Sequence, residues 1–268
     1  MQFDMSRIHH DSIAITVVSP SGDQFVIADN QRSRKQSVIL LKDGFAGGEG
    51  SVDFTVGESV TRYGVRRKGW KVPQLSGSLK VLVTDDEQDL SVAFRRWRAA
   101  WSRFEPTKLK VVWRDGQSSE IDVVLDSAAP LPSSFVGLHS MEDEISWTNF
   151  SGVWTGSRQV YSGTFTKAFP GELPPSLRLK WDGRATSFTL PSGLKLTLGQ
   201  GPGERFINLD RGMQGQITDV NGVVDSDTWS SLRGVLVGET LTPHKLYTFQ
   251  LGAGLELEAI PRYLSPWR

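Results

Sequence analysis

The chain has 268 residues, with 30 basic and 30 acidic side chains, a formal net charge of zero and no cysteine. This length suffices for two domains, and the 38% hydrophobic content argues against a disordered chain. The balanced charge excludes a bulk basic nucleic-acid binder, and the missing cysteines exclude disulfides, thiolate catalysis and cysteine-ligated metals. The first twelve residues hold no apolar run, and no stretch approaches the roughly 18 apolar residues of a spanning helix. We therefore expect neither a signal peptide nor a membrane anchor.

The first 128 residues are predicted to form a mainly β domain. Short apolar or alternating runs bounded by turn residues predict strands at 13–18, 25–27, 38–41, 52–56, 59–65 and 77–84. A hairpin is expected over 111–125, with its turn at Asp115-Gly116. The glycine-rich segment 42–50 is expected to be a mobile loop.

One helix is predicted inside this β domain, at about residues 88–104. Its large apolar residues follow spacings of 4, 3, 4 and 3, which place all five on one helical face: Leu90, Phe94, Trp97, Trp101 and Phe104. Acidic residues precede the helix and arginines follow within it, which suits the helix dipole. We expect the five apolar residues to dock the helix on the β domain.

A basic segment, residues 64–77, has no clear period and admits two interpretations. It is either a solvated loop or an extended arm that contacts a neighbouring subunit or a polyanion. The arm is worth considering because Trp70 lies beside Arg66, Arg67 and Lys68, which is unusual for a loop that only faces water. These four residues, together with Phe45 of the glycine-rich segment, are the candidate subunit contacts.

A linker is predicted at about 127–134, where two prolines and three serines follow the end of a strand. Residues 135–268 would then form a second domain. Short strand candidates with turn residues between them predict a β-sandwich there, at 160–166, 177–181, 186–190, 194–198, 205–209, 215–218, 247–251 and 255–260.

No motif in the sequence points to catalysis, a metal or a cofactor. The glycine-rich segment 199–205 lacks the Gly-Lys-Ser/Thr ending of a phosphate loop and is expected to be a hairpin loop. The carboxylates of 141–144, and those of Asp225 and Asp227, fall in turn-like segments and are expected to be solvated or to cap helices. We therefore predict a protein that is not an enzyme.

The sequence resembles the distal tail proteins of long-tailed, non-contractile phages, often called minor tail proteins in phages of actinobacteria. Three stretches carry this resemblance. They are Val65 to Val83 with its Gly69-Trp70 and Leu75-Ser76-Gly77, the capped helix from Asp89 to Trp101 with the hairpin after it, and the ending Ala259 to Arg268.

This resemblance implies a fold and a role. The N-terminal domain would be a tail-tube-like β-barrel or sandwich with one flanking helix, and the C-terminal domain a galectin-like β-sandwich. Six copies would form a ring in the tail tip of the virion, made in the host cytoplasm. The ring would join the tail tube protein to the tail-tip hub protein of the baseplate and its receptor-binding proteins. Its channel would pass the tape measure protein and DNA.

An alternative function is a carbohydrate-binding module for glycans of the host cell surface. It rests on five tryptophans in the second half of the chain, whose rings could stack on sugars: Trp147, Trp154, Trp181, Trp229 and Trp267. The competing interpretation is that these side chains fill the core or subunit contacts. A glycan hydrolase is a third class, but it needs a pair of carboxylates across a cleft.

Overall fold

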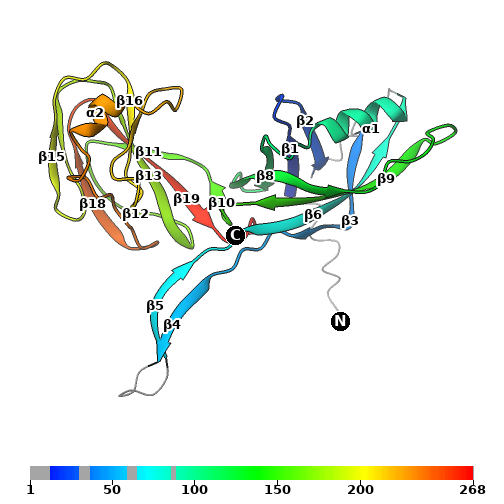
Figure 1. Cartoon of the computed structure of the whole chain (residues 1–268), viewed down its shortest axis with the longest axis horizontal. Helices are drawn as coiled ribbons and strands as arrows, with labels where there is room; N and C mark the ends of the chain where they lie inside the picture. The colour runs from blue at the N-terminus through cyan, green and yellow to red at the C-terminus, as the bar shows by residue number, and fades with distance from the viewer. Residues whose placement is uncertain (1–12, 30–36, 59–64, 86–88, 268) are drawn as a thin grey trace. The chain divides into compact units, whose positions relative to one another are not determined.

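The computed structural model describes residues 13–29, 37–58, 65–85 and 89–267, which form nineteen strands and two helices (Figure 1). The predicted mainly β fold class is confirmed. The chain divides into two compact units, the first made of residues 1–154 and 264–268 and the second of residues 155–263. It leaves the first unit within β10 (Trp154–Gly156) and returns to it after Tyr263.

The first unit is built on antiparallel strands in the order β2-β1-β7-β8-β9-β6-β3. β8 joins the two halves of this arrangement, because its first part pairs with β7 and its second part, from Val124, pairs with β9. The strands are β1 (Ile13–Val18), β2 (Gln24–Ala28), β3 (Val38–Gly47), β6 (Leu75–Thr84), β7 (Thr107–Trp113), β8 (Ser118–Ala128) and β9 (Ser140–Asn149).

Alternation along these strands produces the core of the first unit. In β1, Ile13, Ile15 and Val17 are buried while the residues between them are half-buried. β6 and β7 follow the same alternation, except that the inward positions Gly77 and Trp113 are only half-buried. Because successive side chains of a strand point to opposite faces, this period of two directs one face of each strand into the core.

The helix α1 (Leu90–Ala99) begins at Asp89, whose side chain accepts a hydrogen bond from the Ser91 backbone N–H at 2.7 Å. Leu90, Phe94 and Trp97 are buried, and the Trp97 ring meets Phe25 of β2 edge-on at 5.5 Å between centroids. Trp101 is buried just beyond the helix end.

The helix is shorter than the sequence predicts, and Phe104 takes no part in docking it. The helix ends at Ala99, so the helical spacing that would place Phe104 on the buried face does not continue that far. The Phe104 side chain is 93% exposed. Residues 86–88, which include the predicted helix start, lie outside the described residues.

A buried ion pair fastens α1 to β9. The Asp143 side chain is 1% exposed and accepts hydrogen bonds from Arg98 Nε at 2.7 Å and from Trp97 Nε1 at 3.0 Å. Arg98 also contacts the second carboxylate oxygen and donates to the Ala129 carbonyl at 2.7 Å. Burial raises the pKa of the Asp143 carboxyl, although the Arg98 and Trp97 donors oppose that shift.

β9 corrects the interpretation of residues 141–144 as a turn. Two of its four inward positions are polar, Asp143 and Asn149, and they interrupt the apolar alternation that would have revealed a strand. Because β9 pairs with both β6 and β8, the chain stays in the first unit up to residue 154. The division therefore lies beyond the linker predicted at 127–134.

The second segment that differs from the prediction is 42–50. Most of it continues β3, paired with β6 as far as Gly47, with an irregularity between Leu40 and Phe45. Asp43 has a positive φ of 57° there, and a Cβ on Gly44 would lie 2.4 Å from the Lys80 carbonyl oxygen. The glycines thus permit close backbone approach in a bulged strand.

The second unit has two antiparallel sheets with a common core (Figure 1). One has the order β17-β16-β13-β19-β11, and the other β12-β18-β14-β15. The predicted strand 160–166 is two strands, which separate at Gly163 with φ of 68°. The elements are β11 (Gln159–Ser162), β12 (Thr164–Ala168), β13 (Leu173–Trp181), β14 (Thr186–Thr189), β15 (Lys195–Leu198), β16 (Arg205–Asn208), β17 (Ile217–Thr218), α2 (Ser226–Ser230), β18 (Leu246–Leu251) and β19 (Leu255–Tyr263).

Replacing Arg98 by leucine should destabilise the first unit by about 3–5 kcal/mol, because it leaves the Asp143 carboxyl buried without its cation. The matched control is Arg96→Leu on the same helix, whose ion pair with Asp23 is half-exposed at 3.1 Å. That change should cost at most about 1 kcal/mol. Denaturant unfolding followed by tryptophan fluorescence measures both. Equal losses in the two variants would contradict the role given to the buried pair.

Candidate functional site

A separate two-stranded ribbon is the most distinctive surface feature of the first unit. It consists of β4 (Asp53–Glu58) and β5 (Val65–Lys71), which pair with each other and with no other strand of the described residues (Figure 1). Its strand β5 takes up half of the basic segment 64–77 that the sequence analysis singled out. That segment is therefore an ordered strand in its first half, and its last residues begin β6.

One face of the ribbon is apolar and exposed. Phe54 and Trp70 lie directly opposite each other in the strand register and are 52% and 42% exposed. Val56, two residues after Phe54 and so on the same face of β4, is 52% exposed. At the base of the ribbon, Lys71 and Asp53 form an exposed ion pair at 3.8 Å.

The candidate subunit-contact residues fall in two places. Lys68 and Trp70 are exposed on β5. Arg66 and Arg67 belong to the same strand, but their side chains lie outside the described residues. Phe45 is half-buried in β3, where it helps to line a pocket. The sequence analysis had no signal for this pocket, since its walls come from four distant segments.

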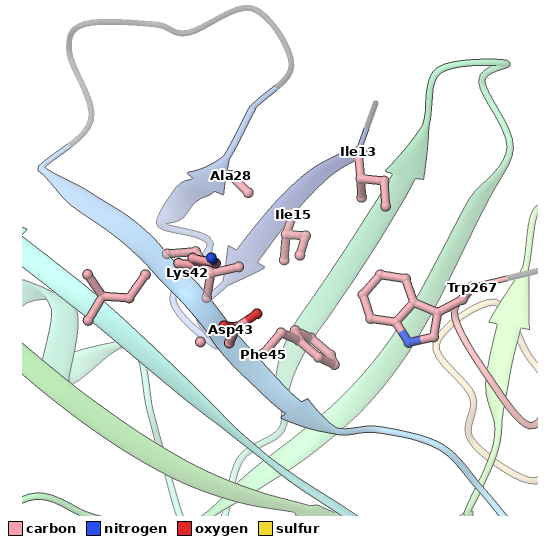
Figure 2. A pocket seen from close by; sticks show the side chains of 10 residues that line it. Ile13, Ile15, Ala28, Lys42, Asp43, Phe45 and Trp267 are labelled. Carbon is pink, nitrogen blue, oxygen red and sulfur yellow. The ribbon is translucent and has the colours of Figure 1, made fainter. Parts of the chain in front are cut away.

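The pocket has a volume of about 260 Å³ and a mainly apolar lining. Figure 2 shows the aliphatic side chains of β1 on one side and the rings of Phe45 and Trp267 on the other. The bulged part of β3 contributes the exposed residues Lys42 and Asp43 at its edge. The full lining is Ile13, Ile15, Ala28, Leu40, Leu41, Lys42, Asp43, Gly44, Phe45 and Trp267.

The end of the chain supplies one wall of this pocket. The Trp267 ring meets Phe45 edge-on at 5.2 Å and Trp113 at 6.2 Å between centroids. Trp113 Nε1 donates a hydrogen bond to the Pro266 carbonyl at 3.0 Å, and the Gly50 backbone N–H donates to the Leu264 carbonyl at 2.6 Å. The returning segment 264–267 is thus part of the first unit.

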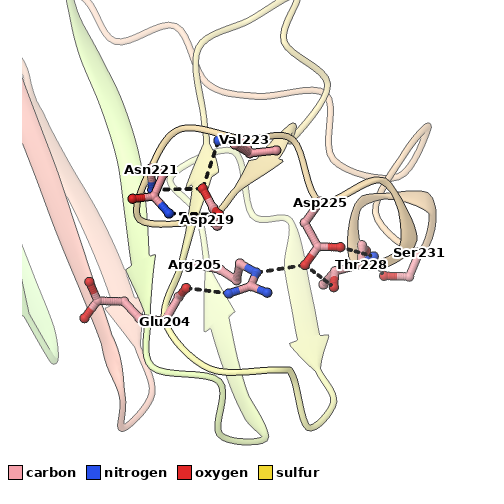
Figure 3. A network of polar contacts seen from close by, with 8 residues as sticks. All are labelled: Glu204, Arg205, Asp219, Asn221, Val223, Asp225, Thr228 and Ser231. Carbon is pink, nitrogen blue, oxygen red and sulfur yellow. Dashed lines mark hydrogen bonds and ion pairs between the residues drawn. The ribbon is translucent and has the colours of Figure 1, made fainter.

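In the second unit, one of the two acidic residues that the sequence analysis expected to be solvated or to cap a helix, Asp225, does cap one. Asp225 is the N-cap of α2 and accepts hydrogen bonds from the Thr228 backbone N–H at 3.0 Å and from Arg205 Nε at 2.8 Å (Figure 3). Arg205 and Thr228 together lower the pKa of the Asp225 carboxyl. Asp219 accepts the backbone N–H groups of Asn221 and Val223 and closes a turn.

The tryptophans of the second half are mostly structural. Trp147 and Trp154 are fully buried in the first unit, and Trp181 is 2% exposed in the core of the second. Trp229 is half-buried, donates to the Gln214 carbonyl at 2.9 Å and has Arg233 over its ring. The sugar-binding alternative rests on exposed tryptophan rings. Because three of these five indoles are buried, that alternative loses most of its support.

The described residues show no group of three or more histidine and acidic side chains that could hold a metal ion. The segment 199–205 does not form a phosphate-binding loop at a helix. It precedes β16, and its Gly201 lies so close to Trp181 that a Cβ would be 2.2 Å from the indole ring. Among the described helices, none has the length and apolarity needed to cross a membrane.

Comparison with known proteins gives a match in structure only. Neither a model of a known family nor a curated protein sequence matches the chain. The fold is similar to that of the Dit protein (gp 19.1) of phage SPP1, described as a paradigm of the hub adsorption apparatus in phages that infect Gram-positive bacteria. The TM-score is 0.59 at 9% identity, over 92% of this chain and 98% of that one.

Two further similar structures are chains of the phage p2 baseplate in its activated conformation. The calcium form gives a TM-score of 0.54 at 7% identity, over 93% of this chain and 98% of that chain. The strontium form gives 0.54 at 7% identity, over 92% and 97%. This chain therefore has the fold of phage hub and baseplate proteins along almost its whole length, in agreement with the resemblance found in the sequence.

Trp267→Ala should destabilise the first unit by about 2 kcal/mol, because the half-buried indole packs on two aromatic rings and closes the pocket. Phe104→Ala is the matched control, since it removes an exposed aromatic side chain from the same unit and should change stability by at most about 0.5 kcal/mol. Chemical denaturation of both variants gives the two values. If Phe104→Ala lowered the stability as much as Trp267→Ala, the assignment of Phe104 as exposed and Trp267 as packed would be contradicted.

Asp225 should make part of the stability depend on acid pH. Its folded pKa lies below its unfolded value of 3.8, so its contribution is present above that value and is lost as the pH falls through the folded pKa. Asp225→Asn should therefore lower the denaturation midpoint at neutral pH. Below about pH 4, the difference in midpoint between the variant and the wild type should become smaller. Midpoints measured from pH 2 to pH 7 test this, and a constant gap would contradict it.

Proposed function

We propose that this chain is a structural component of the tail tip of a long-tailed, non-contractile phage, where it is the distal tail protein. The observation that carries the proposal is the similarity to phage hub and baseplate chains over 92–93% of this chain, both units included. The resemblance of its sequence to distal tail proteins supports the same role independently of the structure. In this proposal the protein is located in the virion, and its role is structural assembly rather than catalysis.

In this role six copies form a ring that joins the tail tube protein to the tail-tip hub protein. The ring lines a channel through which the tape measure protein and DNA pass, and receptor-binding proteins attach around it. A closed ring of identical chains needs a heterologous contact, in which one surface of a copy meets a different surface of the next. The ribbon of β4 and β5 supports such a contact, because one of its faces is apolar and about half exposed.

The two units divide the work in this proposal. The first, with its single docked helix, forms the ring, and the second is the outward galectin-like sandwich. The second unit has the two antiparallel sheets and shared core that such a sandwich requires. The shape of a sandwich does not by itself imply binding of galactosides, since function resides in sites rather than in folds.

The purified full-length protein should form a ring of about 180 kDa, six chains of 29.7 kDa each, with a central hole in negative-stain images. Light scattering on the eluting peak gives the mass, and class averages of the same peak give the symmetry. A protein that remains a monomer near 30 kDa, both alone and mixed with the tube and hub proteins of its phage, would contradict the proposal.

A further inference from the structure

One sheet of the second unit, that of β17, β16, β13, β19 and β11, has a polar outer face. Its inner face supplies Leu179, Ile207 and Leu257 to the core, so the residues next to these along each strand point away from the core. The strand register places these outward residues in two rows across the sheet. One row is Val160, Glu258, Arg178 and Asn208, and the next is Ser162, Glu256, Lys180 and Phe206. Paired strands hold such side chains more precisely than a loop does.

A buried carboxylate on this face holds two arginines in place. Glu258 is 4% exposed, and one of its oxygens accepts a hydrogen bond from Arg158 Nη1 at 3.0 Å. Its other oxygen is paired with Arg178 Nε. The Arg178 guanidinium also lies over the Phe206 ring, 4.4 Å from the ring centroid. Each guanidinium group is therefore fixed by a carboxylate oxygen, and that of Arg178 by an aromatic ring as well.

Stability is a weak explanation for this group of charges. A buried ion pair stabilises a fold little, if at all, compared with apolar side chains of similar volume. A guanidinium group has five N–H donors, and each of these two gives one to Glu258. Within the described ranges of the chain, neither Arg158 nor Arg178 has another hydrogen-bond partner, and their side chains are 55% and 42% exposed. Two fixed, charged donor groups therefore face the solvent.

A polar hollow of about 280 Å³ lies on the second row of residues. Ser162, Lys180 and Glu256 of that row line it, together with Glu204 just before β16. Lys180 and Glu204 form an ion pair at 3.0 Å, and this hydrogen bond raises the pKa of the Lys180 amine. The exposed Glu256 carboxylate has no hydrogen-bond partner in the described part of the chain. The volume is slightly below the roughly 300–1,000 Å³ of most small-molecule sites, which suits one small ring.

These groups fit a neutral ligand with many hydroxyl groups. The charged side chains of the two rows and the hollow's ion pair balance, with three basic and three acidic members: Arg158, Arg178, Lys180, Glu204, Glu256 and Glu258. An ion therefore gains no net attraction. A hydroxyl both donates and accepts, so the vicinal hydroxyls of a saccharide can bond to guanidinium and carboxylate groups together. Because Arg178 covers the Phe206 ring, such binding does not depend on stacking against an aromatic side chain.

We propose that this outer face of the second unit binds a neutral saccharide. One sugar ring enters the hollow, where Glu256 accepts a hydrogen bond from a hydroxyl, and Arg158 and Arg178 donate to hydroxyls of the part that lies over the sheet. Glu258 does not contact the ligand and is a positioning residue. The site lies within one chain, so this proposal goes beyond the proposed function and does not depend on a ring. In a ring, the repeated sites would bind a surface glycan with increased avidity.

Binding of neutral oligosaccharides to the full-length protein tests the proposal. The probes are an array of oligosaccharides of glucose, galactose, rhamnose and N-acetylglucosamine, with titration of each bound probe in solution. We expect saturable binding of at least one probe, with an affinity that changes little between low and high salt, because a neutral ligand forms no ion pair for salt to screen. The absence of saturable binding to every probe overturns the proposal. Binding of poly(glycerol phosphate) alone, lost at high salt, also overturns it, because the face would then be an anion site.

Two variants locate the binding on this face. Arg178→Gln and Glu256→Ala should each raise the Kd of the bound probe at least about tenfold, as expected for the loss of one hydrogen bond to a charged group. Arg233→Gln is the matched control, because it removes an exposed arginine of the same unit that lies over Trp229 and belongs to neither row. Its Kd should equal that of the wild type. Thermal unfolding shows that each variant is folded, and if Arg178→Gln is not, the exposed Glu256→Ala decides.

The outcomes distinguish this proposal from the proposed function. If folded Arg178→Gln and Glu256→Ala bind the probe as the wild type does, the site is overturned even though a saccharide binds elsewhere. A protein that forms rings but binds no probe overturns the saccharide site and leaves the tail-tip role intact. A protein that binds the probe through these residues without forming rings supports the site and counts against the ring alone.

Discussion

The first unit depends on the buried contact between α1 and β9. Asp143 is the only acidic side chain among the buried residues of this unit that the structure describes, and Arg98 and Trp97 of the helix both donate to it. A buried carboxylate is costly in free energy unless it is paired. The position of β9 therefore requires the helix donors beside it, and the helix is held in turn by this carboxylate. Since β9 lies between β6 and β8, this contact also connects the helix to the strands that hold the two halves of the sheet together.

The second constraint is the path of the chain, which returns to the first unit after completing the second. The segment 264–267 is held there by backbone hydrogen bonding to Gly50 and by aromatic packing on Phe45 and Trp113. Residues 264–267 therefore complete a unit whose other described residues all precede 155. The pocket is one consequence, because Trp267 is one of its walls.

The function resides in surfaces that the fold itself does not fix. Solved phage hub and baseplate chains share this fold at 7–9% identity, so the surfaces that make contacts can differ greatly between them. In this chain we propose the ribbon of β4 and β5 as one such contact surface.

The sequence by itself determined the elements whose side chains follow a simple period. The alternation of β1 and of β6, the helical spacing from Leu90 to Trp101 and the turn at Asp115-Gly116 required only local physics. Only the tertiary structure revealed β9, because its buried Asp143 is acceptable solely next to Arg98, 45 residues away. It also decided that Phe104 is exposed and that Trp267 returns to Phe45, since helix ends and chain returns depend on partners distant in sequence. The division of the chain near residue 154 has the same origin: strand pairing across the sheet, rather than the proline-rich composition of 127–134, sets where the first unit ends.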